Sequence, residues 1–178
     1  MHIRQAELSD IDVIVDMDHS YMTDHVWQMS GRDTSTETSA VFRLVRLPRL
    51  VQAPYQHDKA TLRRILLRCD LVWVAEGEAS RDIAGYIGMT THPWQNGGAL
   101  PCMAVAPRER RKGIGAQLFR TAAAQAKADG LQGLMVDLQT KNYPATRMCQ
   151  TLGFHFSGYA DNYYQARDIA LFFTYKIR

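Results

Sequence analysis

The most informative segment of the sequence is Val105-Ala-Pro-Arg-Glu-Arg-Arg-Lys-Gly-Ile-Gly-Ala-Gln-Leu118. An apolar strand pattern ends at Val105, a basic turn follows, and two glycines open a helical pattern. The first N–H groups of a helix have no internal partner and lie at the positive end of its dipole. Glycines at this place remove the Cβ atoms that would keep an anion from approaching the backbone. The stretch therefore predicts a phosphate site at a strand-to-helix junction.

The loop differs from two common phosphate-binding motifs. The third glycine of the Gly-x-Gly-x-x-Gly pattern of dinucleotide folds is absent, and Lys112 precedes Gly113, whereas the lysine of a Walker loop follows its glycine. Arg110, Arg111 and Lys112 add positive charge beside the glycines. Taken alone, the same residues are also compatible with a tight turn that carries solvated arginines.

The pattern on both sides of this loop alternates strands and helices. We expect strands at residues 3–6, 71–75, 83–89, 100–105, 134–138 and 170–177. We expect helices after Ser9-x-x-Asp12, which reads as a capping box, and at 113–129 and 144–152. Pro101 favours an edge or a distorted position for its strand. The pattern predicts antiparallel strands with inserted helices, not a Rossmann fold.

The stretch from residue 31 to residue 70 is less regular. The polar run 31–39 is interpreted as a surface loop, and residues 40–70 as helical but broken by Pro48 and Pro54. This second part is basic, and its positive residues are Arg43, Arg46, Arg49, Lys59, Arg63, Arg64 and Arg68. Either a solvated helical surface or a basic wall for a phosphate or an acidic partner fits this composition.

Length and composition are those of an ordinary globular protein. The 178 residues are 46% hydrophobic and 22% charged, with a net charge of +3, so we expect a single domain over residues 1–178. The three cysteines form no C-x-x-C pair and the histidines have no metal-ligand spacing, so no metal site is predicted. Without an apolar run of about 18 residues or a signal peptide, we expect a soluble, cytoplasmic protein without a membrane or nucleic-acid partner.

Two motifs together resemble one family. The spacing Arg110-x-x-Gly113-x-Gly115 resembles motif A of the GCN5-related N-acetyltransferases (GNAT), in which this turn holds the coenzyme A pyrophosphate. The run Asn142-x-x-Ala145-x-x-Met148-Cys149-x-x-Leu152-Gly153-Phe154 is similar to motif B of the same family. The segment after Phe154 looks more particularly like the streptothricin and ribosomal-protein acetyltransferase branches.

The resemblance implies a fold, an activity and a cofactor. The implied fold is α/β (α+β), with a GNAT-type mixed and mostly antiparallel central sheet, helices on both faces, and splayed fourth and fifth strands. The implied activity is direct transfer of an acetyl group from acetyl-CoA to a primary amine, carried by a small molecule or by a protein. A coenzyme A-binding module with little transfer activity is the alternative, and a homodimer is possible.

The resemblance also implies residues that bind the cofactor. Met103, Ala104 and Val105 would offer backbone groups to the pantetheine amides. The pyrophosphate would be bound by Arg110, Arg111, Lys112, Gly113, Ile114, Gly115 and Ala116. Asn142 would bind the arm or the thioester region, although by itself it is equally well the first residue of a helix.

The catalytic residues are less well determined. Cys149 occupies the position of the family's usual acid, a tyrosine, and either a buried inert thiol or a proton donor fits it. Tyr159 is a candidate replacement for that acid, and no spacing prefers it over Tyr143, Tyr163 or Tyr164. His92 is the candidate base, although it also fits a turn before Pro93. Glu76 and Asp137 are further options for the base.

Overall fold

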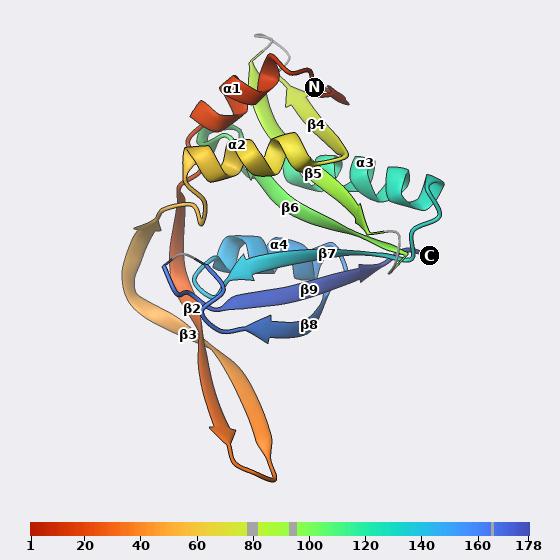
Figure 1. Ribbon diagram of the computed structural model, residues 1–178. Coiled ribbons are helices and arrows are strands. Elements are labelled where there is room, and N and C mark those ends of the chain that lie inside the picture. The colour runs from red at the N-terminus through yellow and green to blue at the C-terminus, as the bar shows by residue number, and fades with distance from the viewer. Residues whose placement is uncertain (78–81, 93–95, 165) are drawn as a thin grey trace.

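The computed structural model describes residues 1–77, 82–92, 96–164 and 166–178, without the side chain of His92. Four α-helices and nine strands follow one another in the described residues (Figure 1). Their order is β1 (His2–Gln5), α1 (Asp10–Asp16), β2 (Tyr21–Asp33), β3 (Thr38–Ala53), α2 (Lys59–Arg68), β4 (Leu71–Glu76), β5 (Ile83–His92), β6 (Gly97–Val105), the short 3₁₀ turn η2 (Pro107–Glu109), α3 (Ile114–Ala128), β7 (Gly133–Gln139), α4 (Tyr143–Thr151), β8 (His155–Ala160) and β9 (Ala170–Lys176).

Seven strands form one sheet in the order β1-β4-β5-β6-β7-β9-β8. All neighbours in it are antiparallel except β6 and β7, which are parallel. Their pairing is confined to Gly98 with Leu134 and Ala99 with Met135, and beyond these residues the two strands separate. The predicted mixed, mostly antiparallel sheet is confirmed. Its expected fourth and fifth strands are β6 and β7, and they splay as the resemblance implied.

Helices cover both faces of the sheet, because its strands alternate between two cores. Trp73 and Ala75 of β4 pack in the core that includes α3 and residues of α4. Val74, between them, packs on the other face in the core that includes Ile14 of α1 and Leu62 of α2. Helices on both faces are therefore confirmed. In the described part of the chain, no helix combines the length and apolarity needed to span a membrane.

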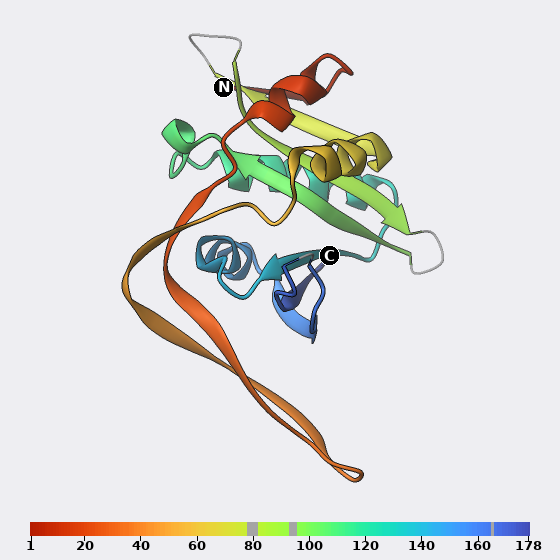
Figure 2. The same ribbon diagram turned by 60° about the vertical axis from the view of Figure 1, so that its left-hand side comes forward.

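Strands β2 and β3 form a separate two-stranded ribbon, called the arm below, that leaves the body of the protein (Figures 1 and 2). The interpretation of 31–39 as a loop and of 40–70 as mainly helical is therefore wrong for most of these residues. The β-branched and aromatic residues Val41, Phe42 and Val45 favour a strand here. Pro48 is tolerated because it lies in the register shift of the ribbon, between the paired residues Arg46 and Val51. The seven basic residues are divided between β3 and α2 and do not form one helical wall.

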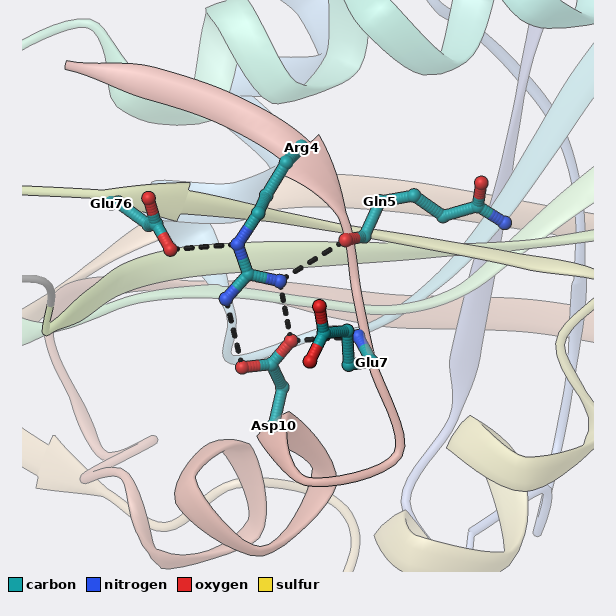
Figure 3. A network of polar contacts seen from close by, with 5 residues as sticks. All are labelled: Arg4, Gln5, Glu7, Asp10 and Glu76. Carbon is teal, nitrogen blue, oxygen red and sulfur yellow. Dashed lines mark hydrogen bonds and ion pairs between the residues drawn. The ribbon is translucent and has the colours of Figure 1, made fainter.

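The capping box expected at Ser9 is not formed, since the Ser9 side chain makes no capping hydrogen bond to α1. Instead, the Asp10 carboxylate accepts hydrogen bonds from the Arg4 guanidinium, at 2.6 and 3.0 Å, and from the backbone N–H of Glu7 (Figure 3). Arg4 also donates to Glu76 at 2.7 Å. This network joins β1, α1 and β4. The Arg4 guanidinium holds the pKa of Asp10 below its ordinary value.

Candidate active site

A cleft with a volume of about 640 Å³ opens where β6 and β7 separate. Its walls are both strands, the first turn of α3, one side of α4 and the base of the arm. The residues that line it include Met103 of β6, Val136 and Asp137 of β7, and Met148 of α4. The cleft is mostly apolar.

One end of the cleft is suited to an anion. Gly113, before α3, has a left-handed backbone with φ of +85°, and Arg111 has φ of +66°. The first N–H in α3 with a helical acceptor is that of Gln117, which donates to the carbonyl oxygen of Gly113 at 3.1 Å. The N–H groups of Ile114, Gly115 and the next residue, at the positive end of the helix dipole, therefore remain available to a ligand.

Glycine is favoured at the two positions of this loop for different structural reasons. A Cβ atom at Gly113 would meet nothing within 4 Å, so the glycine is favoured by its left-handed backbone. At Gly115 a Cβ would lie 3.0 Å from the Cε atom of Met103 and 3.1 Å from the Sδ atom of Met148, both of which line the cleft. A larger side chain at Gly115 would therefore enter the space of the cleft.

The charged residues of the loop have specific partners. The Arg110 guanidinium folds back and donates from Nε to the carbonyl oxygen of Val105 at 2.9 Å. Lys112 pairs with Glu109 at 3.0 Å and is not among the described residues that line the cleft. Of the candidate cofactor-binding residues, the cleft brings together Met103, Ala104, Val105, Arg110, Arg111, Gly113, Ile114, Gly115, Ala116 and Asn142.

A phosphate-bearing ligand with an extended, amide-containing arm fits these residues. Met103, Ala104 and Val105 of β6 lie beyond Ala99, the last residue that pairs with β7. Their backbone is therefore not paired with β7. The Val105 carbonyl oxygen accepts from Arg110 and Met103 has a backbone hydrogen bond with Tyr55, whereas the remaining backbone groups at this edge can hydrogen-bond an extended amide chain as another strand would. The available N–H groups of α3 lie at the end of this edge, where a pyrophosphate would bind.

Asn142 is the N-cap residue of α4. Its side-chain oxygen accepts a hydrogen bond from the backbone N–H of Ala145 at 3.3 Å. The residue is buried and lines the cleft. Asn142 therefore lies at the start of a helix, as one interpretation expected, and it also lines the cleft.

Cys149 lies on α4 and lines the cleft, with 4% of its surface exposed. Burial raises the pKa of its thiol to about 12, so the thiol is protonated at neutral pH. A protonated thiol in an apolar wall is compatible with packing and is a weak acid.

The other candidate acids lie outside the described lining of the cleft. Tyr159 is on β8, where its ring packs 5.2 Å from that of Phe42. Tyr143 packs against His25 at the start of α4, and Tyr163 packs against Tyr164.

Two of the candidate bases, Glu76 and His92, are not found at the cleft in the described part of the chain. Glu76 is bound to Arg4 at the other side of the sheet. The backbone of His92 ends β5 and pairs with Gly97, whereas its side chain lies outside the described part of the chain.

Asp137 of β7 is the candidate base that lines the cleft. Its Oδ2 atom accepts a hydrogen bond from the hydroxyl of Tyr164 at 2.8 Å. Burial raises the pKa of Asp137, and the bond from Tyr164 and the nearby His57 oppose that rise. The only other carboxylate among the described lining residues belongs to Glu109, which is paired with Lys112. Asp137 thus carries a carboxylate with a single described side-chain partner.

Aromatic residues that the motif analysis did not include form the wall beside this end of the cleft. The Nε2 atom of His19 lies 3.1 Å from the hydroxyl of Tyr86, and the His19 ring packs 5.0 Å from that of Tyr55. Tyr21, at the base of the arm, donates to Gln139 at 3.2 Å. These residues come from separate segments, so no spacing in the sequence could have indicated their proximity.

Comparisons with known proteins agree with this geometry. Residues 39–154 match the model of the acetyltransferase (GNAT) family. A streptothricin acetyltransferase of Streptomyces lavendulae is 34% identical over 93 residues, which are 52% of this chain and 49% of that protein. The match therefore spans about half the length of that relative.

Three solved structures have a similar fold. A nourseothricin acetyltransferase superposes with a TM-score of 0.84 at 21% identity, over 99% of this chain and 98% of the other. A Bacillus anthracis protein assigned as a streptothricin acetyltransferase was solved with acetyl coenzyme A. It superposes with a TM-score of 0.78 at 19% identity, over 99% of this chain and 98% of the other. The ribosomal-protein-S18-alanine N-acetyltransferase of Escherichia coli superposes with a TM-score of 0.68 at 16% identity, over 99% of this chain and 93% of the other.

The family match includes both motifs that carry the resemblance. The turn from Arg110 to Gly115 and the segment from Asn142 to Phe154 lie within residues 39–154, as do both strands of the cleft. The predicted family is confirmed: this chain belongs to the acetyltransferase (GNAT) family.

Proposed function

We propose that this chain is an acetyl-CoA-dependent N-acetyltransferase that acts on a primary amine. The observation that carries the proposal is the cleft between β6 and β7, with available helix N–H groups at one end and a carboxylate on its wall. The first feature suits a donor with a pyrophosphate, and the second suits an acceptor that must lose a proton.

The donor is held by backbone groups in this proposal. The edge of β6 at Met103, Ala104 and Val105 binds the amide-containing arm, and the N–H groups at Ile114, Gly115 and Ala116 bind the pyrophosphate. Arg111 adds charge there, while Arg110 fixes the loop to the end of β6. Acetyl-CoA supplies a thioester whose carbonyl carbon accepts the amine; the C–S bond then breaks, and coenzyme A leaves as a thiolate that takes up a proton from the solvent to give the free thiol. Backbone N–H groups of β6 can stabilise charge on that carbonyl oxygen.

We infer that Asp137 accepts the proton of the amine. An amine attacks a thioester only as the neutral species, so a base within reach of its ammonium form is required. Asp137 combines a position on the cleft wall with a pKa that burial raises toward the working pH. Tyr164 is then a positioning residue, because its hydroxyl fixes the carboxylate oxygen at 2.8 Å. Cys149 is assigned to packing.

A small-molecule amine is the proposed acceptor. The support is the 34% identity to a streptothricin acetyltransferase and the likeness in fold to a nourseothricin acetyltransferase. A protein amino group is the second candidate, since the fold is shared with an enzyme that acts on the N-terminal alanine of a ribosomal protein.

The test is release of free thiol from acetyl-CoA with a panel of amines that includes streptothricin-type compounds and peptides. We expect turnover that falls by roughly 10²–10⁴ in Asp137→Asn, with the affinity for acetyl-CoA unchanged by calorimetry. Asp161→Asn is the matched control, because Asp161 is exposed on the surface. Tight acetyl-CoA binding without turnover of any amine would favour a coenzyme A-binding module instead.

A further inference from the structure

The chain exposes more surface than a compact monomer of its mass. Its solvent-accessible surface is 10665 Å². A compact monomer of 20.2 kDa exposes about 8,800 Å², which leaves an excess of about 1,900 Å². A stable protein–protein interface covers about 800 Å² on each partner, and permanent homodimers cover more. The excess is therefore large enough for one obligate interface.

Much of the excess is expected on the arm, because the arm projects from the body in both views (Figures 1 and 2). Every residue from 28 to 39 is exposed. Among the described residues, β2 and β3 form ladder pairs only with each other. One backbone bond joins this ribbon to the body, from the Trp27 N–H to the carbonyl oxygen of Thr140 at 2.9 Å, and for residues 28–39 no backbone bond outside the ribbon is described. An isolated two-stranded ribbon is at best marginally stable in water. The outer part of the arm therefore requires a partner for most of its stabilising contacts.

The arm has an apolar face. Trp27 pairs with Leu44 and Met29 pairs with Phe42, which places these four side chains on one side of the ribbon. Phe42 reaches the body and packs 5.7 Å from the ring of Phe156 on β8.

A groove lies between the arm and the body. Its volume is about 380 Å³, and it is lined by Trp27, Ala40, Val41, Phe42, Gln150, Phe156, Leu171 and Phe173. Phe156 is 52% exposed and Val41 is 44% exposed, so the apolar groove is open to the outside.

We propose that a second copy of this chain covers the arm and this groove, in a two-fold dimer. In a two-fold interface the same patch serves both partners, so the patch must carry both the projecting and the receiving apolar surface. This chain carries both, as the arm with the exposed side chains of Met29 and Leu44, and as the groove beside Phe156. The excess area also agrees with the area that each copy loses in an obligate homodimer. The proposal does not rest on the proposed catalytic function.

The test is sedimentation velocity of the whole chain over a range of about 1 to 100 µM, because association depends on concentration. We expect a species of twice the chain mass of 20.2 kDa. The double variant Met29→Asp, Leu44→Asp should be monomeric, because both residues lie on the apolar face of the arm and each substitution places a charge in the covered surface. Leu67→Asp is the matched control, since Leu67 is 56% exposed on α2, outside the arm, and this variant should remain dimeric.

A second variant, with a shortened arm, tests the same interface if the charged arm fails to fold. Replacing residues 28–43 by an Asn-Gly turn closes the ribbon after the paired residues Trp27 and Leu44, and it removes Met29 together with the outer part of the arm. Far-UV circular dichroism then reports whether the body remains folded. A monomeric wild type at all concentrations would overturn the proposal, and so would a folded, shortened variant that remains dimeric. The first of these results would assign the arm to a different partner.

Discussion

The proposed role of Asp137 makes a quantitative prediction for Tyr164→Phe. The Tyr164 hydroxyl donates a hydrogen bond of 2.8 Å to the Asp137 carboxylate, and this bond favours the ionised form. Its loss must therefore raise the pKa of Asp137, which burial already raises. A base is active only when it is deprotonated. The acidic limb of kcat/KM should accordingly move to higher pH in the variant, while the plateau at higher pH stays close to that of the wild type.

The size of the shift follows from the contact. A hydrogen bond to a charged group contributes about 1.5–3 kcal/mol. Because one pH unit corresponds to 1.36 kcal/mol, the limb should move upward by about one to two pH units. The assay is thiol release at subsaturating amine across the pH range, with circular dichroism to show that the fold is kept at each pH.

A neighbouring histidine requires a control. His57 also interacts with Asp137, and burial lowers the pKa of His57. In the described part of the chain, the other titratable groups that interact with Asp137 are the hydroxyls of Tyr55 and Tyr163 and the thiol of Cys102. The variant His57→Gln should keep an acidic limb, because the limb belongs to the carboxylate. An unchanged limb in Tyr164→Phe, or a limb that disappears in His57→Gln, would refute the assignment.

The remaining predictions concern the cofactor loop, the thiol and the N-terminal ion pair. In a folded Gly115→Leu variant, calorimetry should detect no acetyl-CoA binding, because the added side chain enters the cleft; wild-type affinity would contradict the site. Cys149→Ala should keep turnover within a few-fold and lose about 1 kcal/mol of unfolding free energy, whereas a loss of roughly 10² or more would make the thiol the acid. Asp10→Asn should lose about 2–4 kcal/mol in urea unfolding at pH 7. That difference should shrink as the pH falls through the lowered pKa of Asp10, since the ion pair stabilises the protein only while Asp10 is ionised; an equal difference at low pH would contradict it.

The sequence predicted the part of the fold in which local signals agree. The predicted helix at 113–129 is α3 (Ile114–Ala128), and Gly130, just beyond it, has a left-handed backbone with φ of +75°, which is typical of a glycine that ends a helix. The strands predicted at 71–75 and 83–89 are β4 and β5, which pair antiparallel. In these segments the spacing of the apolar residues, the turn residues and the helix ends all indicate the same structure. The local preferences therefore agree with the tertiary contacts.

The arm could not be predicted because its local signals conflict. Its apolar residues, such as Leu44 and Leu47, alternate irregularly with arginines, a pattern that fits a helix as well as a strand. What selects the strand is pairing with β2, a partner about 20 residues away. The strand β8 (His155–Ala160) was missed as well, since its burial pattern is mostly exposed and carries little alternation.

The acid–base end of the cleft was only partly predictable for a topological reason. Asp137 was one option among several because a carboxylate inside an apolar strand has no motif. Its significance depends on which strand lies beside β7 and on where the two strands stop pairing. Tyr164, which fixes the carboxylate, is 27 residues further along the chain, in the connection between β8 and β9. No spacing rule joins these two residues.

The position of Pro101 connects the sequence to the opening of the cleft. In the pairing of β5 with β6, Gly88 lies opposite Cys102 and Thr90 lies opposite Ala99, so Leu100 and Pro101 together face the single residue between Gly88 and Thr90. This is a β-bulge, which bends its strand and increases the local twist. Pro101 has no N–H to donate to a neighbouring strand, so the bulge places it where a ladder bond is not needed.

The bulge explains why β6 and β7 separate at this point. Their last pair is Ala99 with Met135, directly before the bulge on β6. Beyond the pair, β6 turns away, and residues two positions further on each strand, Pro101 and Asp137, both line the cleft. The same local irregularity therefore frees the strand edge proposed to bind the donor and exposes the carboxylate proposed to deprotonate the acceptor. A straight, fully paired β6 would leave Asp137 beside a closed ladder, with no opening through which an amine could reach it.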